Sequence, residues 1–157
     1  MQKIRPFLWF DGRAVEAAKF YLSIFKNSEL VSPENLADVD DSGLTSVTFR
    51  IEGQELIAFN GGPHYTFSPA TSFLIECASQ DEVDYYWGRF SEGSDDEGRC
   101  GWLKDKFGVT WQIVPSALFD LLQQDEPKRD AVLNVMYPMT KLDIATLQKA
   151  SDDAPLG

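Results

Sequence analysis

The chain has 157 residues, 43 % of them hydrophobic, which suffices for one domain with a sizeable buried core. Its formal net charge of −11 disfavours nucleic acid and anionic membrane surfaces as partners, because both would repel it. It has neither the apolar core of a signal peptide nor a run of about 18 apolar residues, so we expect a cytoplasmic protein without a membrane span. Cys77 and Cys100 stand in apolar strand-like contexts, and we expect free thiols.

The first part of the chain alternates strand and helix patterns. An apolar run over 4–10 predicts a strand, and Asp11 with Gly12 breaks it and offers a helix cap. Apolar residues then recur every three or four positions over 14–25, which predicts an amphipathic helix. The remaining expectations for this part are a short strand over 29–32, an acidic loop over 33–42, and a hairpin with strands 44–51 and 55–60.

The same pattern restarts near Ser72. A strand over 72–77 precedes a helix capped by Ser79 or Asp81. A hairpin over 100–115 follows, with Gly108 free to take positive φ in the turn and Pro115 ending the second strand. The repeated pattern indicates two β-α-β-β-β modules.

A helical pattern follows the second module. We expect helices that begin at Ser116, at Asp125-Glu126-Pro127 and at Asp143. The predicted organisation is a single domain 1–157, with module one over about 3–62, module two over about 71–115 and a helical tail over about 116–150.

Three stretches carry a family resemblance: Phe10-Asp11-Gly12-Arg13-Ala14-Val15-Glu16-Ala17-Ala18-Lys19-Phe20-Tyr21, then Asn60-Gly61-Gly62-Pro63, and Cys100 to Asp105 with Gly108 to Pro115. Together they resemble the PhnB-like branch of the vicinal oxygen chelate superfamily, which includes glyoxalase, bleomycin resistance proteins and dihydroxybiphenyl dioxygenase. The resemblance covers about 3–150. It implies an α+β fold in which two βαβββ modules form half-barrel sheets around a pocket, usually in a homodimer.

The resemblance also implies a metal site, with one His or Glu on the first and last strand of each module. Of the residues at these positions, Gln112 alone is a comfortable ligand, through a neutral oxygen that binds weakly. Glu55 and Glu76 join it if the register is shifted by one residue. We therefore expect no metal and no cofactor, and a divalent metal held by Glu55, Glu76 and Gln112 is the alternative. The single histidine, His64, is expected at the surface of a loop.

Members of this branch are often labelled 3-demethylubiquinone-9 3-methyltransferase. A methyltransferase needs a cradle for S-adenosylmethionine, usually a Gly-rich turn from a strand into a helix. Gly61-Gly62 leads into Pro63 and a loop instead.

The strands that line the pocket in this family carry aromatic residues here. The aromatic surface would supply affinity for a ligand, and the amide of Gln112 would orient it through a hydrogen bond. The alternative for each aromatic residue is that its side chain is buried in the core of the barrel and does not line the pocket. The candidate pocket residues are Trp9, Phe59, Asn60, Trp102, Trp111 and Gln112.

Four functional hypotheses remain open at this point. The first is a protein or enzyme that holds a small, partly apolar molecule in a metal-free pocket. The others are a metal-dependent lyase, isomerase or dioxygenase, a methyltransferase, and a dimer without chemistry.

Overall fold

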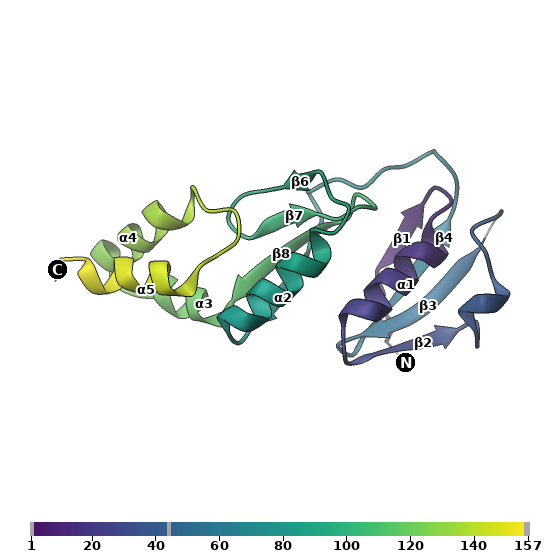
Figure 1. Ribbon diagram of the computed structural model, residues 1–157, viewed down its shortest axis with the longest axis horizontal. Helices are drawn as coiled ribbons and strands as arrows, with labels where there is room; N and C mark the ends of the chain where they lie inside the picture. Colours follow the sequence, from purple (N-terminus) through teal and green to yellow (C-terminus); the bar gives the residue numbers. More distant parts are fainter. Residues whose placement is uncertain (1, 44, 156–157) are drawn as a thin grey trace. The chain divides into compact units, whose positions relative to one another are not determined.

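The computed structural model describes residues 2–43 and 45–155 of the chain (Figure 1). The chain forms two compact units that divide between Phe67 and Ser68. Each unit contains one four-stranded mixed sheet, so the predicted α+β class with two βαβββ modules and C-terminal helices is confirmed.

The first unit contains one module. Its sheet has the strand order β1-β4-β3-β2, with β1 parallel to β4 and the other pairs antiparallel. The predicted first strand is shortened to four residues, and the carbonyl of Pro6 before it accepts a hydrogen bond from Ile57 N at 3.0 Å. The elements are β1 (Phe7–Phe10), α1 (Ala14–Ile24), β2 (Ser28–Ser32), the 3-10 helix η1 (Leu36–Asp38), β3 (Ser46–Ile51) and β4 (Gln54–Asn60).

The second unit repeats this connectivity. Its sheet has the order β5-β8-β7-β6, again with a parallel pair, β5 and β8. The hairpin strand predicted from Cys100 begins only at Trp102, because Cys100 and Gly101 have φ values of 57° and 82°, outside the extended region. The elements of this module are β5 (Phe73–Cys77), α2 (Gln80–Phe90), β6 (Asp96–Glu97), β7 (Trp102–Lys104) and β8 (Thr110–Pro115).

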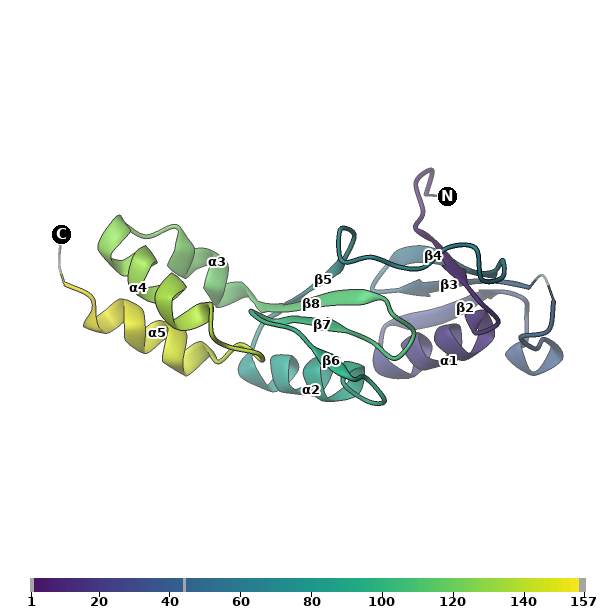
Figure 2. The same ribbon diagram turned by 90° about the horizontal axis from the view of Figure 1, so that it is seen from above.

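One helix packs on one face of each sheet. In the first unit α1 lies along the sheet (Figure 2), contacting β3 and β4, and in the second unit α2 contacts β5 and β8. Strand side chains alternate between the two faces, so every second residue is buried under the helix. In the first unit these are Leu8, Phe10, Val47, Phe49, Ile51, Leu56 and Ala58.

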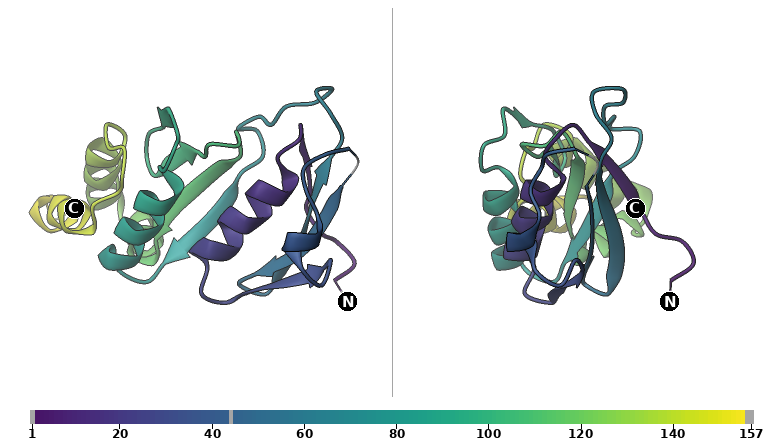
Figure 3. Two further views of the ribbon diagram at one scale, coloured as in Figure 1. Left: turned by 45° about the vertical axis from the view of Figure 1, so that its right-hand side comes forward. Right: turned by 90° about the vertical axis from the view of Figure 1, so that its right-hand side faces the viewer.

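The tail of the second unit consists of α3 (Ser116–Leu122), α4 (Glu126–Met136) and α5 (Ile144–Asp153), seen in Figure 3. Asp143 caps α5 as predicted, accepting from Thr146 N at 2.8 Å. Ser116 is the first helical residue rather than a cap, and its hydroxyl donates to the Cys77 carbonyl at 3.2 Å. α5 continues past the predicted end at about 150. In the described residues, no helix is both long and apolar enough to cross a membrane.

Candidate functional site

The face of the first sheet opposite α1 is the candidate site of this unit, and we call it the first open face. The register pairs Phe7 with Ile57 and Trp9 with Phe59, so their side chains lie side by side. These side chains are half-buried or exposed, unlike those under α1. The residues of the first open face are Phe7, Trp9, Thr48, Arg50, Glu55, Ile57 and Phe59.

Aromatic rings form a continuous run on this face. The Phe59 ring centroid lies 5.3 Å from that of Phe7 and 5.3 Å from that of Trp9. Tyr65, from the loop after β4, stands edge-on to Trp9 at 5.0 Å. Phe7 is 54 % exposed. The structure thus brings the predicted pocket residues Trp9 and Phe59 together and adds Phe7 and Tyr65, which the sequence analysis missed.

The Trp9 side chain is held in place by the loop that follows β4. Its indole Nε1 donates to the Gly62 carbonyl at 2.9 Å. A Cβ on Gly61 would lie 2.1 Å from the Trp9 ring, so only glycine fits beneath it. The Gly61-Gly62 backbone therefore supports an aromatic side chain, and it leads into a turn at Pro63 and His64 rather than into a helix. This loop does not fit the cradle that S-adenosylmethionine requires.

A row of alternating charges crosses the first open face beside the aromatic run. Arg5 Nη1 lies 2.8 Å from Glu55 Oε1, and Arg50 Nη2 lies 3.1 Å from Glu55 Oε2. Arg50 also pairs with Glu29 on the edge strand β2. The Glu55 side chain is 13 % exposed, and the Arg5 guanidinium beside it lowers the pKa of its carboxyl against the opposing effect of burial.

The candidate metal donors do not fit a divalent cation. Both Glu55 carboxylate oxygens accept from guanidinium groups, Glu76 is exposed, and the Gln112 amide donates to Ser72 Oγ at 2.9 Å. His64 lies exposed in its turn. Across residues 2–43 and 45–155, no group of three or more His, Cys, Asp or Glu is placed to hold a metal ion.

Asn60, predicted as a polar pocket contact, caps α1 instead. Its Oδ1 accepts from Ala14 N at 2.8 Å, and its Nδ2 donates to Asp41 Oδ1 at 2.8 Å. Asp41 in turn accepts from Val15 N at 2.8 Å and from Glu16 N at 3.2 Å. The cap expected from Asp11 is therefore replaced by residues distant in sequence. Asn60 and Asp41 line a hollow of about 360 Å³, and both the oxygen and the nitrogen of the buried Asn60 amide have protein partners there.

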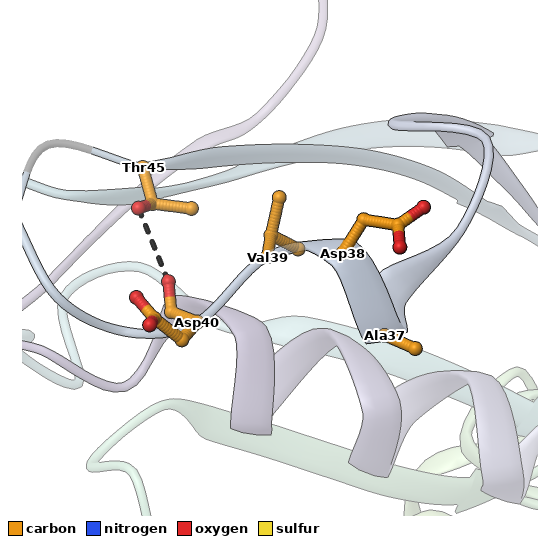
Figure 4. Close-up of a pocket in the computed structure, with 5 residues that line it drawn as sticks. All are labelled: Ala37, Asp38, Val39, Asp40 and Thr45. Carbon is orange, nitrogen blue, oxygen red and sulfur yellow. Dashed lines mark hydrogen bonds between the residues drawn. The ribbon is translucent and has the colours of Figure 1, made fainter.

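A second hollow, of about 310 Å³, lies in the acidic loop (Figure 4). The carboxylates of Asp38 and Asp40 point in different directions there, so they do not converge on one cation. Asp40 accepts from Ser42 N at 2.9 Å and from the Ser42 hydroxyl, and these bonds lower the pKa of its carboxyl. Thr45 Oγ1 donates to the Asp40 carbonyl at 3.2 Å. The Asp40 carboxylate and carbonyl thus accept from residues of the same segment.

In the second unit the structure separates two neighbours that the sequence analysis grouped. Trp111 lies under α2, 2 % exposed, with its ring centroid 4.3 Å from that of Phe90. Its Nε1 donates to the buried Asp105 carboxylate at 2.9 Å. The expectation that Trp111 lines a pocket is therefore corrected: adjacent strand residues face opposite sides, and Trp111 belongs to the core.

The face opposite α2 carries the other two candidates, and we call it the second open face. The register places Leu74, Gln112 and Trp102 side by side on β5, β8 and β7. Leu74 is 48 % exposed, and Trp102 and Gln112 are half-buried. An apolar surface with one amide thus forms on this unit as well. The second open face consists of Ser72, Leu74, Glu76, Trp102 and Gln112.

Neither cysteine is placed as a catalytic nucleophile. Both are free thiols, and in the described residues their hydrogen bonds go to backbone carbonyls, of Ile75 for Cys77 and of Met136 and Tyr137 for Cys100. Burial, with a smaller contribution from the charge of Glu82, raises the pKa of the Cys77 thiol to about 12, so it stays protonated at neutral pH.

Comparison with solved structures supports the fold. The PhnB protein from Bacillus cereus is 32 % identical and has a TM-score of 0.63, over 73 % of this chain and 100 % of that chain. Protein PA1353 from Pseudomonas aeruginosa is 19 % identical, with a TM-score of 0.55 over 73 % of this chain and 98 % of that one. The fosfomycin resistance protein FosX from Listeria monocytogenes, in a monoclinic form, is 15 % identical, with a TM-score of 0.55 over 80 % and 100 %.

No curated protein matches the chain. A family model described as 3-demethylubiquinone-9 3-methyltransferase matches residues 2–114. Because this match spans most of the chain and agrees with the identity to the Bacillus cereus protein, the resemblance found in the sequence is confirmed: the chain belongs to this PhnB-like family of the vicinal oxygen chelate superfamily.

Proposed function

We propose that the protein binds a small, partly apolar molecule on the open faces of its modules, without a metal ion. The observation that carries the proposal is the aromatic run of Phe7, Phe59, Trp9 and Tyr65 on the face that α1 does not cover. When a ligand covers exposed apolar surface of this kind, each Å² removed from water contributes about 25 cal/mol to the free energy of binding. The fixed Trp9 side chain offers that surface without a further ordering cost.

The second open face adds a group that can orient a ligand. The Gln112 carbonyl oxygen can accept a hydrogen bond while its amide nitrogen donates to Ser72. Trp102 and Leu74 flank it with apolar surface. A few polar groups among apolar ones is the usual composition of a small-molecule site.

The four tryptophans provide a direct test. In ¹H–¹⁵N spectra of the full chain titrated with small apolar compounds, the indole signals of Trp9 and Trp102 should shift, because these rings are half-buried on the open faces. The signals of Trp87 and Trp111 should not, because these rings are buried in the core. Single Trp→Phe variants assign the four signals. Shifts confined to the buried pair, or none with any compound, would refute the proposal.

Methyl transfer, the activity in the family description, would require the Gly61-Gly62 loop to bind S-adenosylmethionine, and the structure of this loop does not support that role. The Gly61-Gly62 backbone contacts Trp9, and the chain enters a turn at Pro63 and His64 directly after it, not a helix. Calorimetric titration of the protein with S-adenosylmethionine should therefore show no binding. Micromolar affinity would restore methyl transfer as the leading function.

A metal-dependent reaction is likewise unsupported, because Glu55 is engaged by Arg5 and Arg50. Elemental analysis of protein purified without chelator should give no stoichiometric metal. Iron, manganese, nickel or zinc at one equivalent, lost in Gln112→Ala, would overturn this part of the proposal.

We also propose that the protein is a homodimer. In the described residues, β1 and β5 each pair with a strand on one side only, and such edges readily pair with another chain. Light scattering should therefore give twice the 17.7 kDa mass of one chain. A concentration-independent monomer would refute the dimer.

A further inference from the structure

We infer that the first open face selects an aromatic molecule carrying a carboxylate, and that Arg5 determines this selectivity. The inference deepens the proposed binding function and rests on it. It assigns the charge row next to the aromatic run a role in recognition rather than in stability alone.

The first step is the position of the guanidinium. Arg5 precedes Phe7 and Trp9 by two and four residues along the same chain segment, and its Nη1 lies 2.8 Å from Glu55 on the first open face. Glu55 precedes Ile57, the partner of Phe7, by two residues on that face. Two residues along a strand span roughly 7 Å. A planar ligand stacked on the Phe7 and Phe59 rings would thus have an end within reach of Arg5.

The second step is the charge balance of the row. The half-buried part holds two guanidiniums, of Arg5 and Arg50, and the single carboxylate of Glu55. Glu29, the second partner of Arg50, is 60 % exposed on the edge strand, where water screens its charge. Counting Glu29, the row balances two guanidiniums with two carboxylates. Arg50 contacts both carboxylates, whereas Arg5, two residues before Phe7, is the cation that contacts one. An anion is the complementary ligand group for Arg5.

The third step is the unused hydrogen-bonding capacity of Arg5. In the described part of the chain, its guanidinium has Glu55 Oε1 as its protein partner, through Nη1 alone. Its side chain is 35 % exposed, so the remaining donors are accessible. A guanidinium fork matches a carboxylate in geometry and binds it more strongly than a neutral group. Arg50 has less to offer, because it already donates to two carboxylates.

The test compares a charged probe with its neutral counterpart. Cinnamate and cinnamamide share an aromatic body and differ in the carboxylate. Each is titrated into the full chain while the Trp9 indole signal is followed. Wild type should bind cinnamate about tenfold more tightly than cinnamamide, as expected for a hydrogen bond to a charged group. Arg5→Gln should bring the two affinities within about threefold of each other. The matched control is Arg129→Gln, which removes the same charge from α4 and should leave the preference unchanged.

The outcomes separate this inference from the proposed function. Equal affinities of wild type for both probes would overturn the role of Arg5 and leave ligand binding intact. A carboxylate preference that survives in Arg5→Gln would also overturn it, because another cation would then be responsible. A third outcome is that no compound shifts the Trp9 signal and that Phe7→Asp converts a dimer to monomers. A second copy of the chain then covers this face, and both the ligand-binding proposal and the carboxylate selectivity are wrong.

Discussion

At the residue scale, Gly61 shows how one missing side chain fixes the candidate site. Any Cβ at this position would overlap the Trp9 ring, which in turn contacts Phe59 and Tyr65. The glycine thus determines where the aromatic run can lie. A sequence shows Gly61-Gly62 only as a turn, because the ring above it comes from a strand more than fifty residues earlier.

Gly61→Ala should therefore destabilise the protein and displace Trp9. The expected cost in the free energy of unfolding is about 1–3 kcal/mol, as for overpacked sites, with a shifted Trp9 indole signal. The matched control is Gly88→Ala on the exposed side of α2, where a Cβ meets nothing within 4 Å. That change should stabilise the protein by about 1 kcal/mol, because alanine favours helix over glycine. Denaturant titrations of both variants measure the two effects. An unchanged Trp9 signal in Gly61→Ala would contradict the contact.

At the scale of elements, α1 depends on groups that lie outside it. Three of its first amides donate to Asn60 and Asp41 rather than to a neighbouring cap residue. Free amides at a helix N-terminus need acceptors, and a carboxylate there also complements the helix dipole. The acidic loop that carries Asp41 is thereby tied to the helix and to the end of β4.

Asn60→Ala should cost about 1–3 kcal/mol in the free energy of unfolding, since it leaves the buried Ala14 amide without an acceptor. Hydrogen exchange of Ala14, Val15 and Glu16 should accelerate with it. Asn35→Ala provides the control, because Asn35 caps the exposed three-residue helix η1 and its loss should cost about 0.5 kcal/mol, at the low end for a cap residue. Equal effects of the two substitutions, with unchanged exchange of Ala14, would contradict a special role of Asn60 in holding α1.

At the scale of the whole molecule, local rules predicted the fold and failed at contacts between distant residues. Alternation and turn residues are local, so both modules and the face of α1 could be found from the sequence. The cap of Ala14 by Asn60 spans 46 residues and the pair of Arg5 with Glu55 spans 50, and no local pattern signals either. Strand alternation separates Trp111 from Gln112 but does not say which of the two faces the helix, and the structure places Trp111 in the core.

The helical tail is part of the second unit rather than an appendage. The match to the family model ends at residue 114, and the tail lies beyond it. The Gln80 side chain of α2 donates to the Leu142 carbonyl at 3.0 Å and accepts from Ile144 N at 2.8 Å. Cys100 N and Gly101 N donate to carbonyls of the loop between α4 and α5, each at 2.8 Å. One apolar cluster joins the end of β8 to the tail: Val114, Leu118, Leu121, Val132, Leu142 and Leu147.

Leu147→Ala should therefore weaken the sheet of the second unit as well as the tail. Its fully buried side chain leaves a cavity when truncated, at a cost of about 2–5 kcal/mol. Hydrogen exchange should accelerate in β7 and β8 together with α3, α4 and α5, because these elements share the cluster and the loop contacts. Leu74→Ala is the matched control, since Leu74 is 48 % exposed and its truncation should cost little. Acceleration confined to the three helices would mean that the module folds without its tail, and the cluster would then be a docking contact rather than a shared core.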